Sequence, residues 1–168
     1  MTDTFINLAV LVVSLTALAM STMFWARSFR PIVTAAVETH SAGRDGIAYN
    51  LVILNSGSLP ARNVQLRIAD LTQLEAAISQ DASDNDRTKW LACFEKDNDI
   101  ALLQNGTRVS CSFGMTRNTG TFWRYGASFP MYIHYRGYFG TIYQDYISLR
   151  IVDSDSFTGH VWGTPRAR

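Results

Sequence analysis

An uncharged and almost wholly apolar run, residues 5–26, constrains this chain more than any other feature of its sequence. A helix of this length covers roughly 30 Å, which is the thickness of the hydrocarbon core of a bilayer. A helix of a soluble core is rarely apolar on all sides for so long. We therefore expect a transmembrane helix over residues 5–26, preceded by a short N-terminal tail at residues 1–4.

A cleaved secretory signal is the alternative, since Ala17-Leu18-Ala19 resembles a small-residue cleavage site. A signal peptide normally begins with positively charged side chains, whereas the side chains of residues 1–4 contribute only the charge of Asp3. The apolar run also continues beyond Ala19 to Trp25. We therefore expect an uncleaved, single-pass anchor in contact with the lipid bilayer.

Aromatic and basic residues follow the apolar run. Amphipathic aromatic rings favour the level of the lipid headgroups, and basic residues beside a span favour the cytoplasmic side. No Lys or Arg precedes the span, whereas two arginines follow it at once and Arg44 lies further on. We expect the N-terminus outside and the globular domain in the cytoplasm. The expected membrane-interface residues are Phe24, Trp25, Arg27, Phe29 and Arg30.

Ser14, Ala17 and Ser21 form a line of small residues along one face of the expected helix. Small residues allow a second transmembrane helix to approach closely, so these three are candidate helix-packing residues. The alternative is that they simply face lipid, because alanine and serine are common in such helices.

After Pro31 the hydrophobic pattern changes to a period of two, which is typical of strands. Glycine-marked turns separate about seven short strands, and there is no regular alternation of strands and helices. This pattern predicts a mainly β protein, in which residues 27–152 form an antiparallel β-sandwich. A loop is expected at residues 40–46, and Cys111 shares a strand face with Val109 and Phe113, which places it toward the core. The expected strands are residues 33–38, 47–54, 63–68, 100–103, 107–113, 131–135 and 141–151.

Residues 70–99 interrupt the strands. Apolar residues at helical spacing follow Asp70, a residue that can cap a helix, so we expect a short helix over residues 70–79. Residues 80–99 are polar and acidic around an apolar patch at residues 90–94, and we expect an excursion from the sheet. The acidic residues 81–86 lack the glycine and the terminal glutamate of an EF-hand loop, which favours a solvated loop over a calcium site.

Three sets of turn residues follow recognisable patterns. Residues 55–64 (NSGSLPARNV) are similar to an N-x-G-x-x-x-A-x-N-V hairpin, and residues 100–106 are similar to an L-x-x-G turn. Residues 132–143 are similar to a closing Y-x-D-x-x-G-x-x-Y hairpin, although Gly137 departs from its acidic position. Together these segments resemble bacterial immunoglobulin-like domains, including the cell-adhesion-related type. The resemblance implies an immunoglobulin-like sandwich with a single anchor in the bacterial inner membrane, and it specifies no chemistry.

Composition and motifs argue against nucleic-acid binding and against catalysis. Fifteen Lys and Arg face fourteen Asp and Glu without clustering along the sequence. His40, His134 and His160 lie far apart, with no partner at metal-ligand spacing. The sequence contains no nucleophile elbow, phosphate-binding loop or C-x-x-C motif. We expect neither an enzyme nor a bound cofactor or metal.

Cys93 and Cys111 leave two alternatives open. In an oxidising compartment they could form a disulfide, and otherwise a pair of buried free thiols is equally ordinary in a domain of this size.

Aromatic residues in the loops either pin the loops to the sandwich or anchor a partner. The C-terminal tail, residues 153–168, is also too apolar for a purely solvated segment. The candidate partner-binding residues are Trp90, Phe94, Phe122, Trp123, Tyr125 and Trp162.

These observations favour a non-catalytic accessory or scaffolding subunit of a larger membrane complex, such as a respiratory or photosynthetic one. Other membrane-protein subunits would be its partners. The alternative is an anchored binding module whose loops recognise a ligand or an envelope partner. An anchored enzyme would require a deep polar pocket that contains His134 and a carboxylate.

Overall fold

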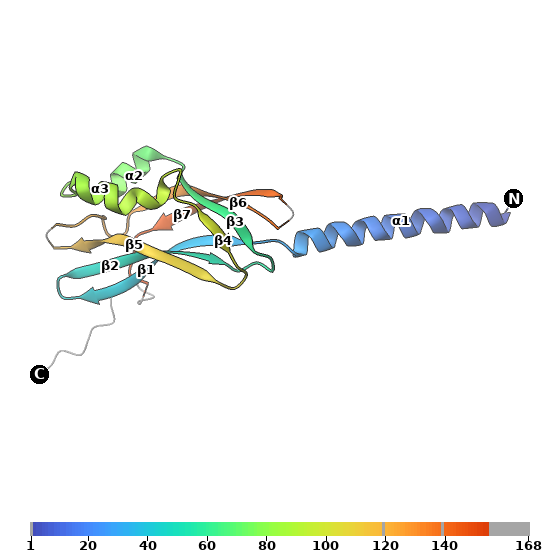
Figure 1. The fold of residues 1–168 in the computed structure, drawn as a ribbon, viewed down its shortest axis with the longest axis horizontal. Coiled ribbons are helices and arrows are strands. Elements are labelled where there is room, and N and C mark those ends of the chain that lie inside the picture. Colours follow the sequence, from blue (N-terminus) through green and yellow to red (C-terminus); the bar gives the residue numbers. More distant parts are fainter. Residues whose placement is uncertain (1, 119, 139, 155–168) are drawn as a thin grey trace, which may run out of the picture.

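The structure is a computed structural model that describes residues 2–118, 120–138 and 140–154. Helix α1 (Thr2–Ser28) projects as a single rod from one end of the β-domain (Figure 1). Its segment Thr4–Trp25 is long and apolar enough to cross a membrane, and none of it is buried inside the protein. The helix continues past the expected end at residue 26, and the amide of Phe29 closes its last turn by donating to the carbonyl of Trp25 at 2.9 Å.

Within the described residues, seven antiparallel strands form the two sheets of a sandwich, as the period-two pattern predicts (Figure 1). The three-stranded sheet has the order β1-β2-β5, and the four-stranded sheet has the order β4-β3-β6-β7. The strands are β1 (Val33–Gly43), β2 (Gly46–Asn55), β3 (Ala61–Ile68), β4 (Ile100–Leu103), β5 (Arg108–Arg117), β6 (Ser128–Arg136) and β7 (Ile142–Arg150).

The turn at residues 104–107 carries the chain from one sheet to the other. β4 pairs with β3, whereas β5 pairs with β2, so these two successive strands do not form a hairpin. In a constant-type immunoglobulin domain the fourth strand lies beside the fifth in one sheet. Here the fourth strand belongs to the opposite sheet, which separates the edges β4 and β5 on one side of the sandwich.

β1 extends further than the Gly- and Ser-rich composition predicts. Residues 40–43 continue the strand instead of forming a loop, and the turn contains only Arg44 and Asp45. Ladder hydrogen bonds to β2 outweigh the weak strand propensity of these residues. The pairing register shifts between Thr39 and Ser41, so His40 occupies a β-bulge.

A group of packed aromatic rings lies in the core between the sheets. The ring of Trp123 lies 4.8 Å from Phe113 and 5.5 Å from Phe129, centroid to centroid, and its indole nitrogen donates to the carbonyl of Phe113. Phe122 packs edge-on against Trp123 at 4.7 Å, and both rings are buried. A role for Phe122 and Trp123 in partner binding is therefore wrong, because these rings pin their loop to the sandwich.

The insertion between β3 and β4 contains more helix than its sequence predicts. Asp70 caps α2 (Leu71–Ala77) as expected, since its carboxylate accepts from the amides of Thr72 at 2.8 Å and Gln73 at 3.2 Å. A second helix, α3 (Asp84–Leu91), and a 3₁₀ turn, η1 (Ala92–Phe94), follow it. The hydroxyl of Ser83 caps α3 by accepting from the amide of Asp86 at 3.1 Å. The acidic residues thus occupy the start of a helix, where they complement its dipole.

Replacing Trp123 with alanine should lower the free energy of unfolding by about 3–5 kcal/mol, because the substitution leaves a large cavity in the core. Tyr125→Ala in the same loop is the matched control, since this side chain is 42% exposed and should change stability by only about 0.5 kcal/mol. Chemical denaturation of the full chain in mild detergent, followed by far-UV circular dichroism, measures both effects. An equal decrease in the free energy of unfolding for the two variants would contradict the assignment of Trp123 to the core.

Candidate functional site

The segment that joins α1 to β1, residues 29–32, is hydrogen-bonded to the turn between β2 and β3, residues 55–59. The amide of Ser58 donates to the carbonyl of Arg30 at 3.2 Å, and the amide of Ser56 donates to the carbonyl of Ile32 at 2.9 Å. These bonds make the linker part of the domain instead of a free tether. We call the linker and this turn the junction.

Asn55 is the buried centre of the junction. Its side-chain oxygen accepts from the amides of Ile32 at 3.2 Å and Gly57 at 3.0 Å. Its side-chain nitrogen donates to the carbonyls of Leu59 at 2.9 Å and Leu103 at 3.1 Å. A side-chain amide has two donor hydrogens and two acceptor lone pairs, and all four are used here. One side chain thus fixes the linker, the turn and the end of β4 relative to one another.

Gly57 allows the turn to approach the linker. A Cβ atom at this position would lie 2.4 Å from both the carbonyl oxygen of Arg30 and the amide nitrogen of Ile32. Both are backbone atoms and cannot move aside as a flexible side chain can, so only glycine fits without displacing the linker.

Tyr135 supports the other side of the linker. Its hydroxyl donates to the carboxylate of Asp145 at 2.7 Å and also lies within hydrogen-bond distance, 3.4 Å, of the carbonyl of Pro31. Burial, followed by the hydrogen bond and the charge of Asp145, raises the pKa of Tyr135. The hydroxyl therefore stays protonated at neutral pH and remains available as a donor.

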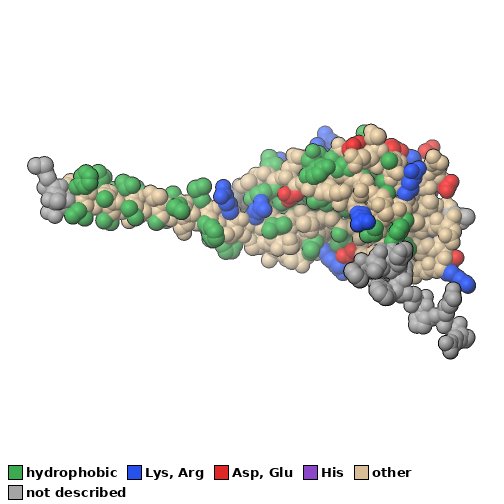
Figure 2. All heavy atoms as spheres, turned by 180° about the vertical axis from the view of Figure 1, so that it is seen from behind, with side chains coloured by type: hydrophobic (Ala, Val, Ile, Leu, Met, Phe, Trp, Pro, Cys, Tyr) green, Lys and Arg blue, Asp and Glu red, His purple; other side chains and the backbone are tan. Residues whose placement is uncertain are grey.

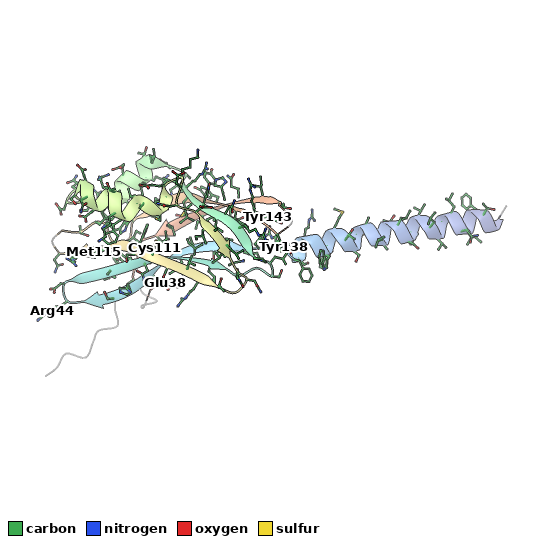
Figure 3. The ribbon with its side chains drawn as sticks, viewed as in Figure 1. Glu38, Arg44, Cys111, Met115, Tyr138 and Tyr143 are labelled. Carbon is green, nitrogen blue, oxygen red and sulfur yellow. The ribbon has the colours of Figure 1, made fainter. Side chains whose placement is uncertain are left out.

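Aromatic and basic side chains surround the junction. Trp25 is 53% exposed and its ring lies 5.1 Å from that of Phe29, while Phe24 is 76% exposed. Basic side chains gather where the apolar rod meets the domain, as Figure 2 shows. A cavity of about 230 Å³ lies among the residues of this region, with Trp25, Arg27, Tyr138 and Tyr143 in its lining. Tyr138 and Tyr143 lie at the end of the domain nearest α1 (Figure 3). The predicted interface residues lie in the last turns of α1 and in the linker that follows it.

The outer face of the four-stranded sheet is a second surface with functional potential. Met131, Ile133 and Tyr135 are buried, so the alternate residues of β6 point outward, and the pairing register places outward residues of β3 and β7 beside them. We call this surface the basic face. Its polar and aromatic members include Arg62, Arg67, Tyr132, His134, Arg136, Tyr146 and Arg150.

Positive charge on the basic face is not balanced by acidic neighbours of the same strands. Asp145 on β7 turns inward to Tyr135. Within the residues that the structure describes, the ion pairs join Arg87 to Glu75 and Arg108 to Glu38, and both pairs lie elsewhere. Partial burial and the charge of Arg67 lower the pKa of His134, which leaves the arginines as the source of charge at neutral pH.

The remaining candidate residues fall into several groups. Trp90 is half-buried beneath the ammonium group of Lys89, which lies 4.2 Å from its ring centroid, and Phe94 packs against the core. Tyr125 is partly exposed and stays a candidate for partner binding. Trp162 lies outside the described residues. Ser14, Ala17 and Ser21 all lie on the exposed surface of α1.

The far end of the domain carries an open hollow of about 540 Å³. The β1–β2 hairpin and residues 115, 117 and 118 line it, and Figure 3 shows Arg44 and Met115 at this end. Among the described residues, no group of three or more His, Cys, Asp or Glu side chains could hold a metal ion. The hollow beside His134, of about 200 Å³, has no carboxylate among its described lining residues.

Replacing Gly57 with alanine should displace the linker and lower the free energy of unfolding by about 1–3 kcal/mol, because a methyl group would clash with backbone atoms. Gly43→Ala is the matched control, since a Cβ atom there meets nothing within 4 Å. Limited proteolysis of the full chain in detergent should cut within residues 29–32 at least about fivefold faster in Gly57→Ala, while the control matches the wild type. Unchanged cleavage in Gly57→Ala would show that the linker does not depend on this contact.

No curated protein and no solved structure matches the chain. Residues 3–154 match the model of a family that is described as a domain of unknown function, DUF8453. The matched region includes nearly all of α1 together with both sheets, so the helix and the sandwich fall within one family unit. The chain belongs to the DUF8453 family.

Proposed function

We propose that the chain is a non-catalytic accessory or scaffolding subunit of a larger membrane complex in the bacterial inner membrane, for example a respiratory or photosynthetic one. The junction is the observation that carries this proposal. A ligand-binding module needs only a flexible tether, whereas the hydrogen bonds of Asn55 and Ser58 hold the linker to the domain. A fixed junction lowers the entropic cost of binding a partner that contacts both the helix and the domain.

The helix supports an intramembrane contact. Its apolar segment is wholly exposed, and Ser14, Ala17 and Ser21 are spaced to offer one face for close approach by another helix. Arg27 and Arg30 after the span favour a cytoplasmic domain with the N-terminus outside. Trp25 and Phe29 would then lie at the level of the headgroups on the same side.

The basic face supports a second contact outside the bilayer. Arginine and tyrosine are among the residue types that are enriched at protein interfaces, and an arginine-rich face favours an acidic surface on a neighbouring subunit. The proposed subunit would thus bind one neighbour, or two adjacent ones, through α1 and through β3, β6 and β7.

Isolation from native membranes tests this proposal. We expect the tagged full chain, extracted in mild detergent, to recover other membrane proteins in stoichiometric amounts. A photo-crosslinking residue at Ala17 should link the chain to one of these proteins, whereas the same residue at Ala19, about 200° around the helix, should link at least about tenfold less. Recovery of a stable monomer without crosslinks from either position would refute the proposal.

Reversing charges on the basic face should weaken the association. The double variant Arg67→Glu and Arg136→Glu is expected to reduce co-purification of the partner at least about tenfold, because like charges would then face each other. The control is Arg44→Glu at the far end of the domain, because each of these substitutions replaces an arginine with a glutamate. Mass spectrometry of the purified material measures the ratio of partner to chain, and equal ratios for both variants would exclude the basic face from the interface.

The hollow at the far end of the domain favours one alternative, a membrane-anchored binding module. It is concave and combines the charged residues Arg44, Asp45 and Arg117 with backbone groups of a hairpin. In that case the chain would be isolated alone, and Arg44→Glu would abolish binding of its ligand while the Arg67 and Arg136 variants would retain it.

A further inference from the structure

One side of the sandwich is closed by hydrogen bonds, whereas the other side is open. Beside β1, the amide of Thr39 donates to the hydroxyl of Ser154 at 2.7 Å. The hydroxyl of Thr39 donates to the carboxylate of Asp153, also at 2.7 Å. On the opposite side the edges β4 and β5 lie in different sheets, and a mostly apolar cavity of about 310 Å³ remains between them. Leu51, Ile53, Val64 and Leu66 contribute its apolar wall. Cys93 and Cys111 both line it, and Asp99 is the charged residue among its described lining residues.

Cys111 points into this cavity from β5. It is paired in register with Leu51 of β2, and residues directly opposite each other in a sheet share one face. Leu51 is fully buried, so that face is the inner one. Cys111 thus lies on the inner face, but it is not part of the core as expected. Its thiol is exposed because β5, on which Figure 3 labels it, is an edge strand.

Cys93 lines the same cavity from η1, and the adjacent residue Phe94 holds η1 in position. The ring of Phe94 packs edge-on against Phe113 at 6.0 Å and against Phe129 at 6.1 Å. Phe113 lies two residues after Cys111 on the same strand, so the aromatic contact holds η1 over β5 at the level of the cysteines. The two thiols interact with each other there.

The two thiols differ in their environments. Cys93 is the more buried, and its side chain also contacts the carbonyl of Trp90 at 3.9 Å. The interaction with Cys93 lowers the pKa of Cys111 to about 7, whereas the interaction with Cys111 and burial raise the pKa of Cys93. Cys111 therefore supplies the thiolate at neutral pH, and it is the thiol that solvent can reach.

We propose that Cys93 and Cys111 form a disulfide by exchange with an external disulfide, either a small molecule or a protein, and that Cys111 is the attacking thiol. The Cys111 thiolate bonds to one sulfur of the external disulfide, whose sulfur–sulfur bond breaks and releases one thiolate. Cys93 then gives its proton to solvent and attacks the Cys111 sulfur, which breaks the mixed bond and releases the second thiolate. The cysteines lose two electrons and two protons, and the external disulfide is reduced to two thiols.

The bond would join the insertion to the edge of the three-stranded sheet. It would connect η1, which follows β3 of one sheet, to β5 of the other, and so close the open side of the sandwich. This modification requires no partner subunit, so its test on the purified chain is separate from the test of the proposed function. We expect the oxidised chain to unfold about 10 °C higher than the reduced one.

Oxidised glutathione, added to the reduced full chain in mild detergent, tests the proposal when the products are alkylated and mapped by mass spectrometry. The wild type should lose both free thiols and give a peptide pair joined through Cys93 and Cys111. Cys93→Ser should hold one glutathione on Cys111, and Cys111→Ser should react at least tenfold more slowly at Cys93. A wild type that keeps both thiols free, or that carries glutathione on both, would overturn the proposal.

The wild type alone also tests the role of Cys111, which keeps the result independent of how the variants fold. The rate at which the first thiol reacts with oxidised glutathione should rise with pH through a midpoint below that of an ordinary thiol, because the attacking species in this step is the Cys111 thiolate. A midpoint near the value of an ordinary thiol, about 8.5, would contradict the assignment of Cys111 as the attacking residue.

Discussion

The buried amide of Asn55 is the interaction on which the arrangement of helix and sandwich depends. Its four hydrogen bonds reach the linker, the β2–β3 turn and the end of β4, three segments that are distant in sequence. Leaving one buried partner unpaired costs about 1–3 kcal/mol, so these bonds favour a single arrangement of the three segments. The same residue anchors the turn that crosses between the sheets, since its carbonyl accepts from the amide of Gly106 at 2.8 Å. The same residue therefore attaches α1 to the domain and holds the two sheets together at this end of the sandwich.

Features with a local periodicity could be predicted from the sequence. The apolar run became α1, and the β6–β7 hairpin formed between the expected strands. Helix α3 was missed because its residues are acidic and polar, although Ser83 and Asp86 have the spacing of a capping box, which could have identified its start. The sequence could not predict that β4 joins the four-stranded sheet while β5 joins the three-stranded one. The composition of a short strand does not determine which sheet edge it joins.

The candidate surfaces depend on contacts between strands that are far apart along the chain, and the sequence could not place them. The motif at residues 55–58 indicates a turn, but the contact of Gly57 with the linker arises only in the folded chain. Likewise, positive charge looks evenly spread along the sequence. Arg62 pairs with Arg136, and Arg67 pairs with Tyr132, so period-two alternation on neighbouring strands gathers the charge on one face.

The side of the membrane and the state of the cysteine pair are linked. Arg27 and Arg30 favour a cytoplasmic domain, and thiols in that compartment are kept reduced by the glutathione and thioredoxin systems. In that location the cavity between β4 and β5 would stay open, and its apolar wall would remain accessible beside Cys111. On the oxidising side the proposed disulfide would persist and tie η1 to β5. The oxidation state of Cys93 and Cys111 in cells therefore reports the orientation of the chain independently of its flanking charges.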